Sequence, residues 1–203
     1  MTARRGVAPE RAARPGRPGR AGGNIQDGTP AREAGAVRTM TAVQTQPPPA
    51  VVNPKFIVPF VNSVRSVFTT MAHVQTTIGR PHVKMQPAPT YDVSGIIGFS
   101  GQVVGSVVVS FTMSAALALV KAFAGAEIPA DSPDFADAIG ELANMITGGA
   151  KKDLGAEATI SVPNVIIGTG HMIARLSGVP CLVIPCTTPV GDFAVEVNIK
   201  QVG

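Results

Sequence analysis

Aromatic side chains are scarce in this sequence, which has no tryptophan, one tyrosine and eight phenylalanines. The core cannot be mainly aromatic, so it must be built from Val, Ile, Leu, Met and Ala. With 45% apolar and 15% charged residues, the chain still has enough apolar side chains to fill an interior. Its 203 residues fit one domain, or one domain with a tail.

Long uninterrupted apolar runs are also missing. Spanning a bilayer takes about 20 consecutive apolar residues, and the richest stretch, residues 103–125, is interrupted by Gly, Ser, Thr and Lys. The N-terminus has arginines but no apolar segment of about 7–15 residues before a cleavage site, so it does not resemble a secretory signal. We expect a cytoplasmic protein that makes no contact with membranes.

Cysteine is nearly absent, with Cys181 and Cys186 as its two occurrences. Five residues apart on one strand, the two side chains would point to opposite faces, so no disulfide is expected between them. Two buried thiols in a reducing compartment are the simplest interpretation.

The basic surplus is confined to the first fifty residues. Residues 1–50 contain eight arginines and three acidic side chains, whereas the rest of the chain holds nine basic and ten acidic residues. The body of the protein therefore offers no basic face for nucleic acid.

The composition of residues 1–50 is dominated by Arg, Pro, Gly and Ala, which is typical of a disordered tail. Three interpretations stay open. The segment could be a solvated extension, the product of a misassigned start with Met40 as the true initiator, or an Arg-rich arm for nucleic acid or anionic lipid. We expect the folded domain to span residues 53–203.

Helical signals open the folded part. Asn53 precedes Pro54, which suits an N-cap followed by proline in the first turn. Apolar residues then recur at helical spacing from Phe60 to Met71 and predict a helix that ends near residue 73. Pro59 marks the start of the regular helix or a kink in it.

Strand patterns and two further helices follow. Residues 94–111 predict a β-hairpin that turns at Ser100-Gly101, and residues 114–123 predict a short helix that stops at Gly125. The next helix should begin at Ser132 as N-cap, with Pro133 in its first turn, and run to about Asp153.

The C-terminal part predicts three strands, at residues 158–168, 181–188 and 192–202, the first with Pro163 inside it. The last strand alternates strictly, with Phe, Val, Val and Ile on the inner face. Glu196, Asn198 and Lys200 then fall on an outer face that we expect to be wet, as in antiparallel sheets. The fold class is therefore α+β, with helices packed on a largely antiparallel β-sheet.

The helix at 133–153 has an unusual outer face. At about 100° per residue, its large apolar residues form one stripe that should pack on the sheet. Asp137, Glu141, Asn144 and Gly148 fall on the opposite side, and Gly140 lies beside them. Bare backbone lets another molecule approach closely, so this face is a candidate site, although a merely solvated face would look the same. Gly149 is expected on the packed flank, against the sheet.

Other candidate motifs fail. His73, His82 and His171 are isolated from one another and from cysteine, so no metal site is expected. The segment at 98–101 falls in a hairpin turn and is not a nucleophile elbow. Neither residues 168–174 nor residues 148–153 complete a nucleotide-binding loop.

The helix and the strand after it resemble a motif of the CheX/CheC/FliY family of chemotaxis phosphatases. That motif is Asp or Ser, three residues, Glu, two residues, Asn, and a Pro about twenty residues later. Asp137, Glu141 and Asn144 match it, and Pro163 follows with eighteen residues between. The hairpin and the short helix also resemble CheX, so the similarity covers about residues 53–202.

This resemblance implies a phosphatase for the aspartyl phosphate of a CheY-like receiver domain. Asn144 would hold the attacking water, Glu141 would pair with the receiver's lysine, and Asp137, Gly140 and Gly148 would contact the partner. Mg²⁺ would come with the receiver, so the chain needs no cofactor of its own. The resemblance also implies a homodimer joined through sheet edges.

CheC-type members carry a second such helix, but the first helix here has Pro59 where Glu would precede Asn62, and Lys55 at the acidic position. One active helix is therefore expected, as in CheX. Two alternatives stay open. One is a non-catalytic interaction module like the FliM middle domain, and the other is a CheX-like component of a two-component pathway outside motility.

Overall fold

The computed structural model describes residues 53–71 and 73–202. The predicted tail at 1–50 and Met40 lie outside the described residues. The helices are a 3-10 turn at Pro54–Phe56, α1 (Val58–Thr70), α2 (Met113–Ala124) and α3 (Pro133–Asp153). The strands are β1 (Thr77–Ile78), β2 (His82–Val83), β3 (Val93–Gly101), β4 (Val103–Phe111), β5 (Ala158–Ile160), β6 (Asn164–Ile167), β7 (Leu182–Thr188) and β8 (Gly191–Gln201).

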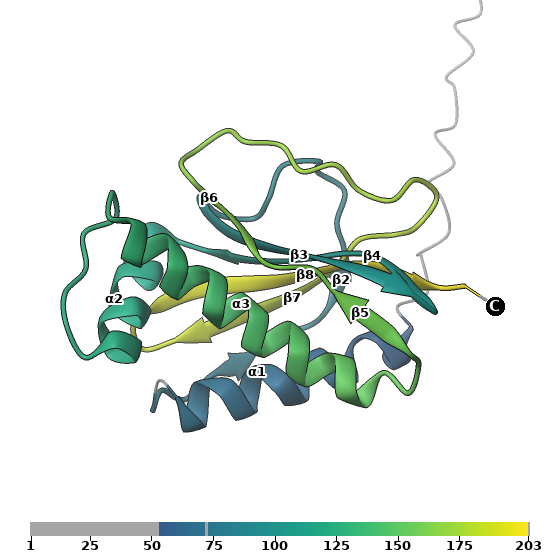
Figure 1. Ribbon diagram of the computed structural model, residues 1–203, viewed down its shortest axis with the longest axis horizontal. Helices are drawn as coiled ribbons and strands as arrows, with labels where there is room; N and C mark the ends of the chain where they lie inside the picture. Colours follow the sequence, from purple (N-terminus) through teal and green to yellow (C-terminus); the bar gives the residue numbers. More distant parts are fainter. Residues whose placement is uncertain (1–52, 72, 203) are drawn as a thin grey trace, which may run out of the picture. The chain divides into compact units, whose positions relative to one another are not determined.

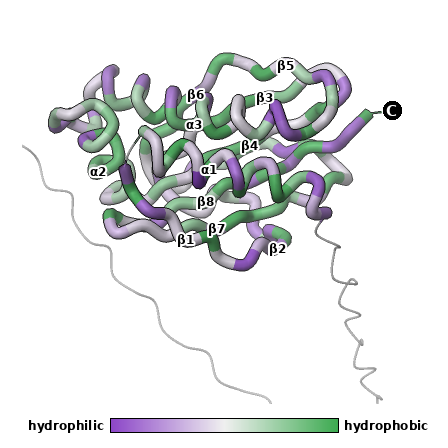
Figure 2. The backbone as a smooth tube through the Cα atoms, turned by 90° about the horizontal axis from the view of Figure 1, so that it is seen from below, coloured by the Kyte–Doolittle hydropathy of each residue, from purple (hydrophilic) through white to green (hydrophobic). Residues whose placement is uncertain are grey.

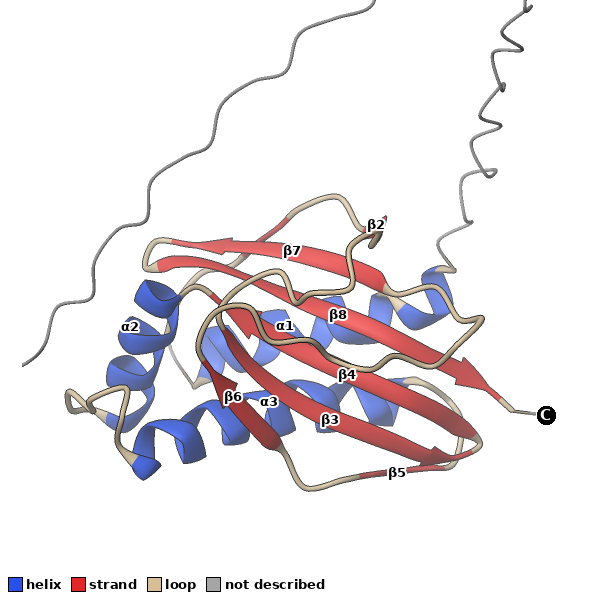
Figure 3. Ribbon diagram, turned by 90° about the horizontal axis from the view of Figure 1, so that it is seen from above, coloured by secondary structure: helices blue, strands red, loops and turns tan. Residues whose placement is uncertain are grey.

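All eight strands join one antiparallel sheet in the order β1-β7-β8-β4-β3-β5, with β2 also paired to β7 and β6 also paired to β3. The long strands β3, β4, β7 and β8 form its centre, and the short strands lie along its two edges (Figure 3). The predicted strand at 158–168 is wrong in one respect, because Ser161, Val162 and Pro163 separate it into β5 and β6.

The helices cover one face of the sheet. Figure 1 shows α1 and α3 side by side under the strands, with α2 at one end of this layer. Along both α1 and α3, hydrophilic and hydrophobic residues alternate (Figure 2). The apolar side of each helix packs on the sheet, and this placement gives the predicted α+β architecture.

The core is mainly aliphatic, as predicted, but three of its aromatic rings stack on one another. Phe68 of α1 stacks on Phe193 of β8 with ring centroids 4.5 Å apart. Phe111 of β4 lies 5.6 Å from the same ring. All three are at most 1% exposed, so this cluster joins the helical layer to the middle of the sheet.

The opposite face of the sheet is not wet, which corrects the prediction made from the alternation of β8. Two connections, residues 84–92 and 168–181, lie across it (Figures 1 and 3). They bury Glu196 and Asn198, while Lys200 stays exposed. Sequence alternation identified which side chains share this face but could not show that other segments cover it.

Glu196 of β8 lies beneath these two connections and is 1% exposed. Its Oε1 accepts hydrogen bonds from Lys84 Nζ (2.8 Å) and from the backbone N–H of Thr90 (2.7 Å). Its Oε2 accepts one from the Arg175 guanidinium (3.1 Å). Two cations and a backbone amide therefore compensate one buried carboxylate, and the same contacts hold both connections to β8.

The ends of α3 match the prediction. Ser132 is its N-cap and accepts a hydrogen bond from the backbone N–H of Asp134 (3.2 Å), with Pro133 in the first turn. The helix ends at Asp153, and Gly155 follows with a φ of 64°. That left-handed conformation suits glycine and stops the helix.

No helix in the described part of the chain is long and apolar enough to cross a membrane. The two cysteines are free and buried, as predicted. Burial raises the pKa of the Cys181 thiol to about 11 and that of the Cys186 thiol to about 12.

Candidate functional site

Glu141 and Asn144 occupy the exposed side of α3, one turn apart. The Asn144 amide donates a hydrogen bond from Nδ2 to Glu141 Oε2 at 3.4 Å, so the two side chains are neighbours at the surface. Glu141 and Asp137 are exposed, whereas Asn144 is half-buried. The structure therefore places an amide and a carboxylate where both can reach one bound molecule.

The inner side of α3 fixes this pair. Its large apolar side chains are at most 1% exposed and pack in the core: Phe135, Ile139, Leu142 and Ile146. A helix held along about three turns cannot easily rotate or shift. The positions of Glu141 and Asn144 are thus set by the scaffold before any partner binds.

Gly140 is not part of a bare outer surface, which corrects the prediction for it. It is buried, and a Cβ at this position would stand 3.2 Å from Pro163 Cγ and 3.4 Å from Val165 Cγ2. The missing side chain makes room for the link between β5 and β6. Pro163, the last residue of the sequence motif, therefore packs directly against the helix that carries the pair.

Gly149 and Gly148 differ although they are adjacent. A Cβ at Gly149 would come 2.3 Å from the hydroxyl of Ser63, so this glycine lets α1, and not the sheet as predicted, approach α3. At Gly148 the nearest atom would be Ile160 Cδ1 at 3.9 Å. Of the two, only Gly148 can accept a Cβ without a clash, at ordinary van der Waals distance from Ile160.

The link between β5 and β6 forms one border of this surface. Ser161 exchanges hydrogen bonds with Gly98, donating its N–H to the carbonyl (2.9 Å) and accepting the Gly98 N–H at its hydroxyl (3.0 Å). The same hydroxyl donates to the carbonyl of Val162 at 2.7 Å. This network holds Val162 in place while its side chain stays 79% exposed.

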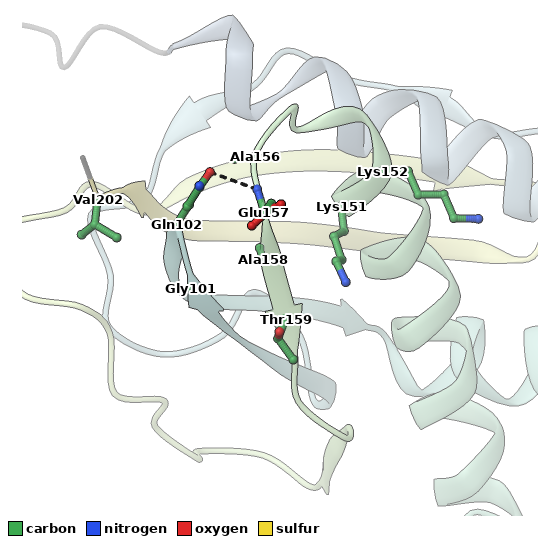
Figure 4. A pocket seen from close by; sticks show the side chains of 9 residues that line it. All are labelled: Gly101, Gln102, Lys151, Lys152, Ala156, Glu157, Ala158, Thr159 and Val202. Atoms are coloured by element: carbon green, nitrogen blue, oxygen red, sulfur yellow. Dashed lines mark hydrogen bonds between the residues drawn. The ribbon is translucent and has the colours of Figure 1, made fainter.

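A basic end of α3 was missed by the sequence reasoning. Lys151 and Lys152 lie two turns beyond Asn144 and line a cavity of about 790 Å³ between the end of α3, the β3–β4 turn and β5 (Figure 4). The helical periodicity that grouped Glu141 with Asn144 would have found these lysines, had it been followed to the end of the helix.

The histidines do not gather into a metal site. Within residues 53–71 and 73–202, no three His, Cys, Asp or Glu side chains come together as metal ligands. The His171 ring bridges the Gly168 carbonyl (2.9 Å) and the Ser94 hydroxyl (3.0 Å), which is a structural role under the cover of the sheet.

The first helix carries no matching pair. Asn62 is exposed on α1, but Pro59 is buried and cannot replace a carboxylate. Lys55 donates a hydrogen bond to Gln201 Oε1 at 2.6 Å and does not form part of a polar site on α1. The exposed Glu–Asn arrangement of α3 therefore has no counterpart on α1.

Comparison with known proteins gives a consistent set of relatives. The model of the family "Chemotaxis phosphatase CheX" matches residues 93–187. A solved structure of a chemotaxis protein CheX from Desulfovibrio desulfuricans is 36% identical, with a TM-score of 0.66 over 73% of this chain and 99% of that one. A putative chemotaxis protein from Desulfovibrio vulgaris Hildenborough is 38% identical, with a TM-score of 0.65 over 72% and 97%.

A third structure is a complex. It is a CheX–CheY–BeF3–Mg²⁺ complex from Borrelia burgdorferi, 26% identical, with a TM-score of 0.60 over 72% of this chain and 98% of that one. No curated protein sequence matches the chain.

Proposed function

The chain belongs to the CheX family of chemotaxis phosphatases, and on that premise we propose that it hydrolyses the aspartyl phosphate of a CheY-like receiver domain. The observation that carries this proposal is the Glu141–Asn144 pair on the exposed side of a helix whose inner side is fixed in the core. The complex of a relative with CheY, BeF3 and Mg²⁺ supports the choice of partner.

The reaction needs little from the phosphatase beyond positioning. A water oxygen forms a bond to phosphorus while the bond to the aspartate oxygen breaks, so the products are inorganic phosphate and a free carboxylate. Because phosphoryl transfer passes through a loose transition state, catalysis comes mostly from alignment and charge stabilisation. One amide that orients the water is then a sufficient contribution from this chain.

Asn144 is the residue suited to hold the water. Its amide has both an acceptor and a donor. The carbonyl oxygen can therefore accept a hydrogen bond from the water while the NH2 group donates one to a neighbour. In the free protein its Nδ2 already donates to Glu141 at 3.4 Å, a long contact that can be exchanged for new partners. We therefore assign Asn144 as the catalytic residue.

Glu141 is suited to bind the receiver. It is exposed and stands one turn from Asn144, so a lysine of the receiver's active site can pair with it as Asn144 enters the same cleft. Asp137 would contact the rim of the partner one turn earlier, and Gly148 would allow close approach one turn later. Gly140, being buried, supports Pro163 and is not proposed as a direct contact.

Mg²⁺ is assigned to the receiver and not to this chain. Asp137 and Glu141 lie on the same exposed side of α3 as Asn144, and no third ligand among the described residues joins them. When bound, the ion would neutralise charge on the phosphoryl oxygens. We also propose a cytoplasmic location. We further propose a homodimer, and light scattering at micromolar concentration would test that oligomeric state.

The deciding experiment is phosphate release from a phosphorylated receiver with the wild-type protein and with Glu141→Ala and Asn144→Ala. Asn62→Ala on α1 is a matched control, because it removes an exposed amide from the other helix. We expect only the control to retain full activity. If the wild-type protein at saturation leaves the receiver's own rate of dephosphorylation unchanged, the proposal is wrong.

A further inference from the structure

The exposed side of α3 continues beyond Asn144 and changes sign along its length. Asp134, Asp137 and Glu141 occupy the first half, while Gly148 is followed by Lys151 and Lys152. At about 100° per residue all of these fall within roughly one third of the helix circumference. The helix is about 30 Å long, close to the diameter of a small domain, so one partner could lie along all of it.

Lys151 differs from an ordinary surface lysine in where its side chain lies. It is half-buried and points into the space between the end of α3 and β5, whereas the end of the Lys152 side chain points away from that space (Figure 4). The open hollow there measures about 790 Å³, and its wall includes Thr159, Gln102 and the acidic Glu157. Lys151 is thus the principal charge that faces this hollow from the helix.

The wall of the cavity is ordered. Gln102 in the β3–β4 turn accepts a hydrogen bond at Oε1 from the backbone N–H of Glu157 (3.1 Å), and its own N–H donates to the Glu157 carbonyl (2.9 Å). These contacts fix the start of β5 to the turn, as Figure 4 shows. The hollow therefore exists before a partner binds.

The charge of Lys151 is not neutralised within the domain. In the part of the chain that the structure describes, neither Lys151 nor Lys152 forms an ion pair, whereas Lys84, Lys121 and Arg175 all do. The helix dipole favours cations in the last turn, which accounts for the sign of these residues. It does not account for a side chain directed into a preformed hollow.

We propose that this hollow takes an acidic side chain from the same receiver domain whose phosphoryl group meets Asn144. The inference rests on the proposed function for the identity of the partner. Seven residues separate Lys151 from Asn144, so the acidic group would lie about 10 Å along the helix from the reacting phosphorus. The receiver must then present positive charge to Glu141 and negative charge to Lys151.

This polarity sets the direction in which the receiver lies on α3. A receiver turned end for end would bring its active-site lysine to Lys151 and its acidic group to Glu141, and both contacts would repel. The distance along the helix between these two contacts is close to the screening length of about 8 Å at physiological salt. The preference for one orientation of the receiver should therefore weaken as salt is raised. Lys151 is accordingly a specificity residue and not a catalytic one.

The test is the affinity of a CheY-like receiver carrying BeF3⁻ and Mg²⁺, measured at low and high salt. Lys151→Glu should weaken binding by about fivefold or more at low salt, because it replaces an exposed ion pair by a repulsion. Lys151→Gln should weaken binding by less, because it only removes the ion pair. Arg80→Glu is the matched control, because it makes the same charge change in the connection before β2, at the other edge of the sheet. Equal effects of Lys151→Glu and Arg80→Glu would overturn the inference.

Turnover measured alongside separates this inference from the proposed function. Lys151→Glu should raise KM for the phosphorylated receiver and leave kcat unchanged, because Lys151 does not touch the reacting atoms. A wild-type protein that turns over normally with no effect of Lys151→Glu on KM or affinity contradicts the inference alone. A wild-type protein that binds in a Lys151-dependent way without releasing phosphate supports the inference and contradicts the phosphatase.

Discussion

Ser63 of α1 occupies the space that a side chain at Gly149 of α3 would need. A Cβ built on Gly149 lies 2.3 Å from Ser63 Oγ, and that hydroxyl donates a 2.7 Å hydrogen bond to the carbonyl of Ile146. One buried contact therefore requires both a small residue on α3 and a hydroxyl on α1. It sets how closely the two helices of the layer approach.

Replacing the two adjacent glycines should have opposite effects on stability. Gly148→Ala places its methyl at ordinary van der Waals distance from Ile160 and removes the helical cost of glycine, so the free energy of unfolding should rise by about 0.5–1 kcal/mol. Gly149→Ala should lower it by about 1–2 kcal/mol, because the new methyl displaces Ser63 from its hydrogen bond. Urea titration of both variants measures the difference.

Ser63→Gly provides the control for that comparison. In the double variant with Gly149→Ala the added methyl has room, so the two losses should be less than additive. Strict additivity would show that the helices do not meet through this contact.

Gly148→Ala should also weaken receiver binding despite its gain in stability, since the methyl covers the bare backbone beside Asn144.

Alanine substitutions at Asn144 and Glu141 should differ in their effects on kcat and on the affinity for the receiver. Asn144→Ala should lower kcat by about a hundredfold or more while the affinity for a BeF3⁻-bound receiver changes little, because a lost alignment affects the transition state alone. Glu141→Ala should weaken affinity as well as turnover. Stopped-flow phosphate release with a separate binding titration distinguishes the two, and equal loss of affinity in both variants would contradict the assignment.

Glu196 should be far more important for stability than its surface counterparts. Glu196→Ala leaves Lys84, whose side chain is 8% exposed, without its carboxylate, and breaking a buried pair costs about 3–5 kcal/mol. Glu127→Ala removes the carboxylate from a solvent-exposed pair with Lys121 and should leave the free energy of unfolding nearly unchanged. Similar thermal unfolding of the two variants would refute a role for Glu196 in holding the connections.

The thiols should make the fold sensitive to alkali. The pKa values of Cys181 and Cys186 are raised by burial to about 11 and about 12 in the folded protein, from an ordinary value of 9.0. Because only the protonated thiols fit the fold, their contribution is complete below about pH 9 and is lost as the pH rises toward these values.

The unfolding free energy measured from about pH 8 to pH 10 should therefore fall less steeply in Cys181→Ala and Cys186→Ala than in the wild-type protein. The native protein should also react slowly with a thiol reagent until it is unfolded. Parallel pH profiles for the wild type and both variants would contradict this account.

The sequence predicted those features that depend on local chemistry. The cap at Ser132, the stop at Gly155 and the shared face of Glu141 and Asn144 all follow from residue type and helical periodicity, and the structure confirms these placements. The resemblance to CheX supplied what spacing could not, since an exposed Glu and Asn one turn apart are common on solvated helices.

Features that depend on distant segments were the ones mispredicted. Gly140 was placed on an open face, yet Pro163, over twenty residues later, covers it. Gly149 was expected against the sheet and meets α1 instead. Glu196 was placed in solvent because its own strand says nothing about Lys84 or Arg175, which reach it from other parts of the chain.

The position of β8 has a consequence for how the protein is made. Of the strands described, this one comes last in the chain and so leaves the ribosome after the others, yet it lies in the middle of the sheet, between β4 and β7. Until residues 191–201 are available, the β3–β4 hairpin and β7 have no common neighbour, and Glu196 is not there to hold either connection. Nascent chains must therefore wait with two unjoined half-sheets, and deletion of the final strand should leave a polypeptide that chaperones retain and proteases remove.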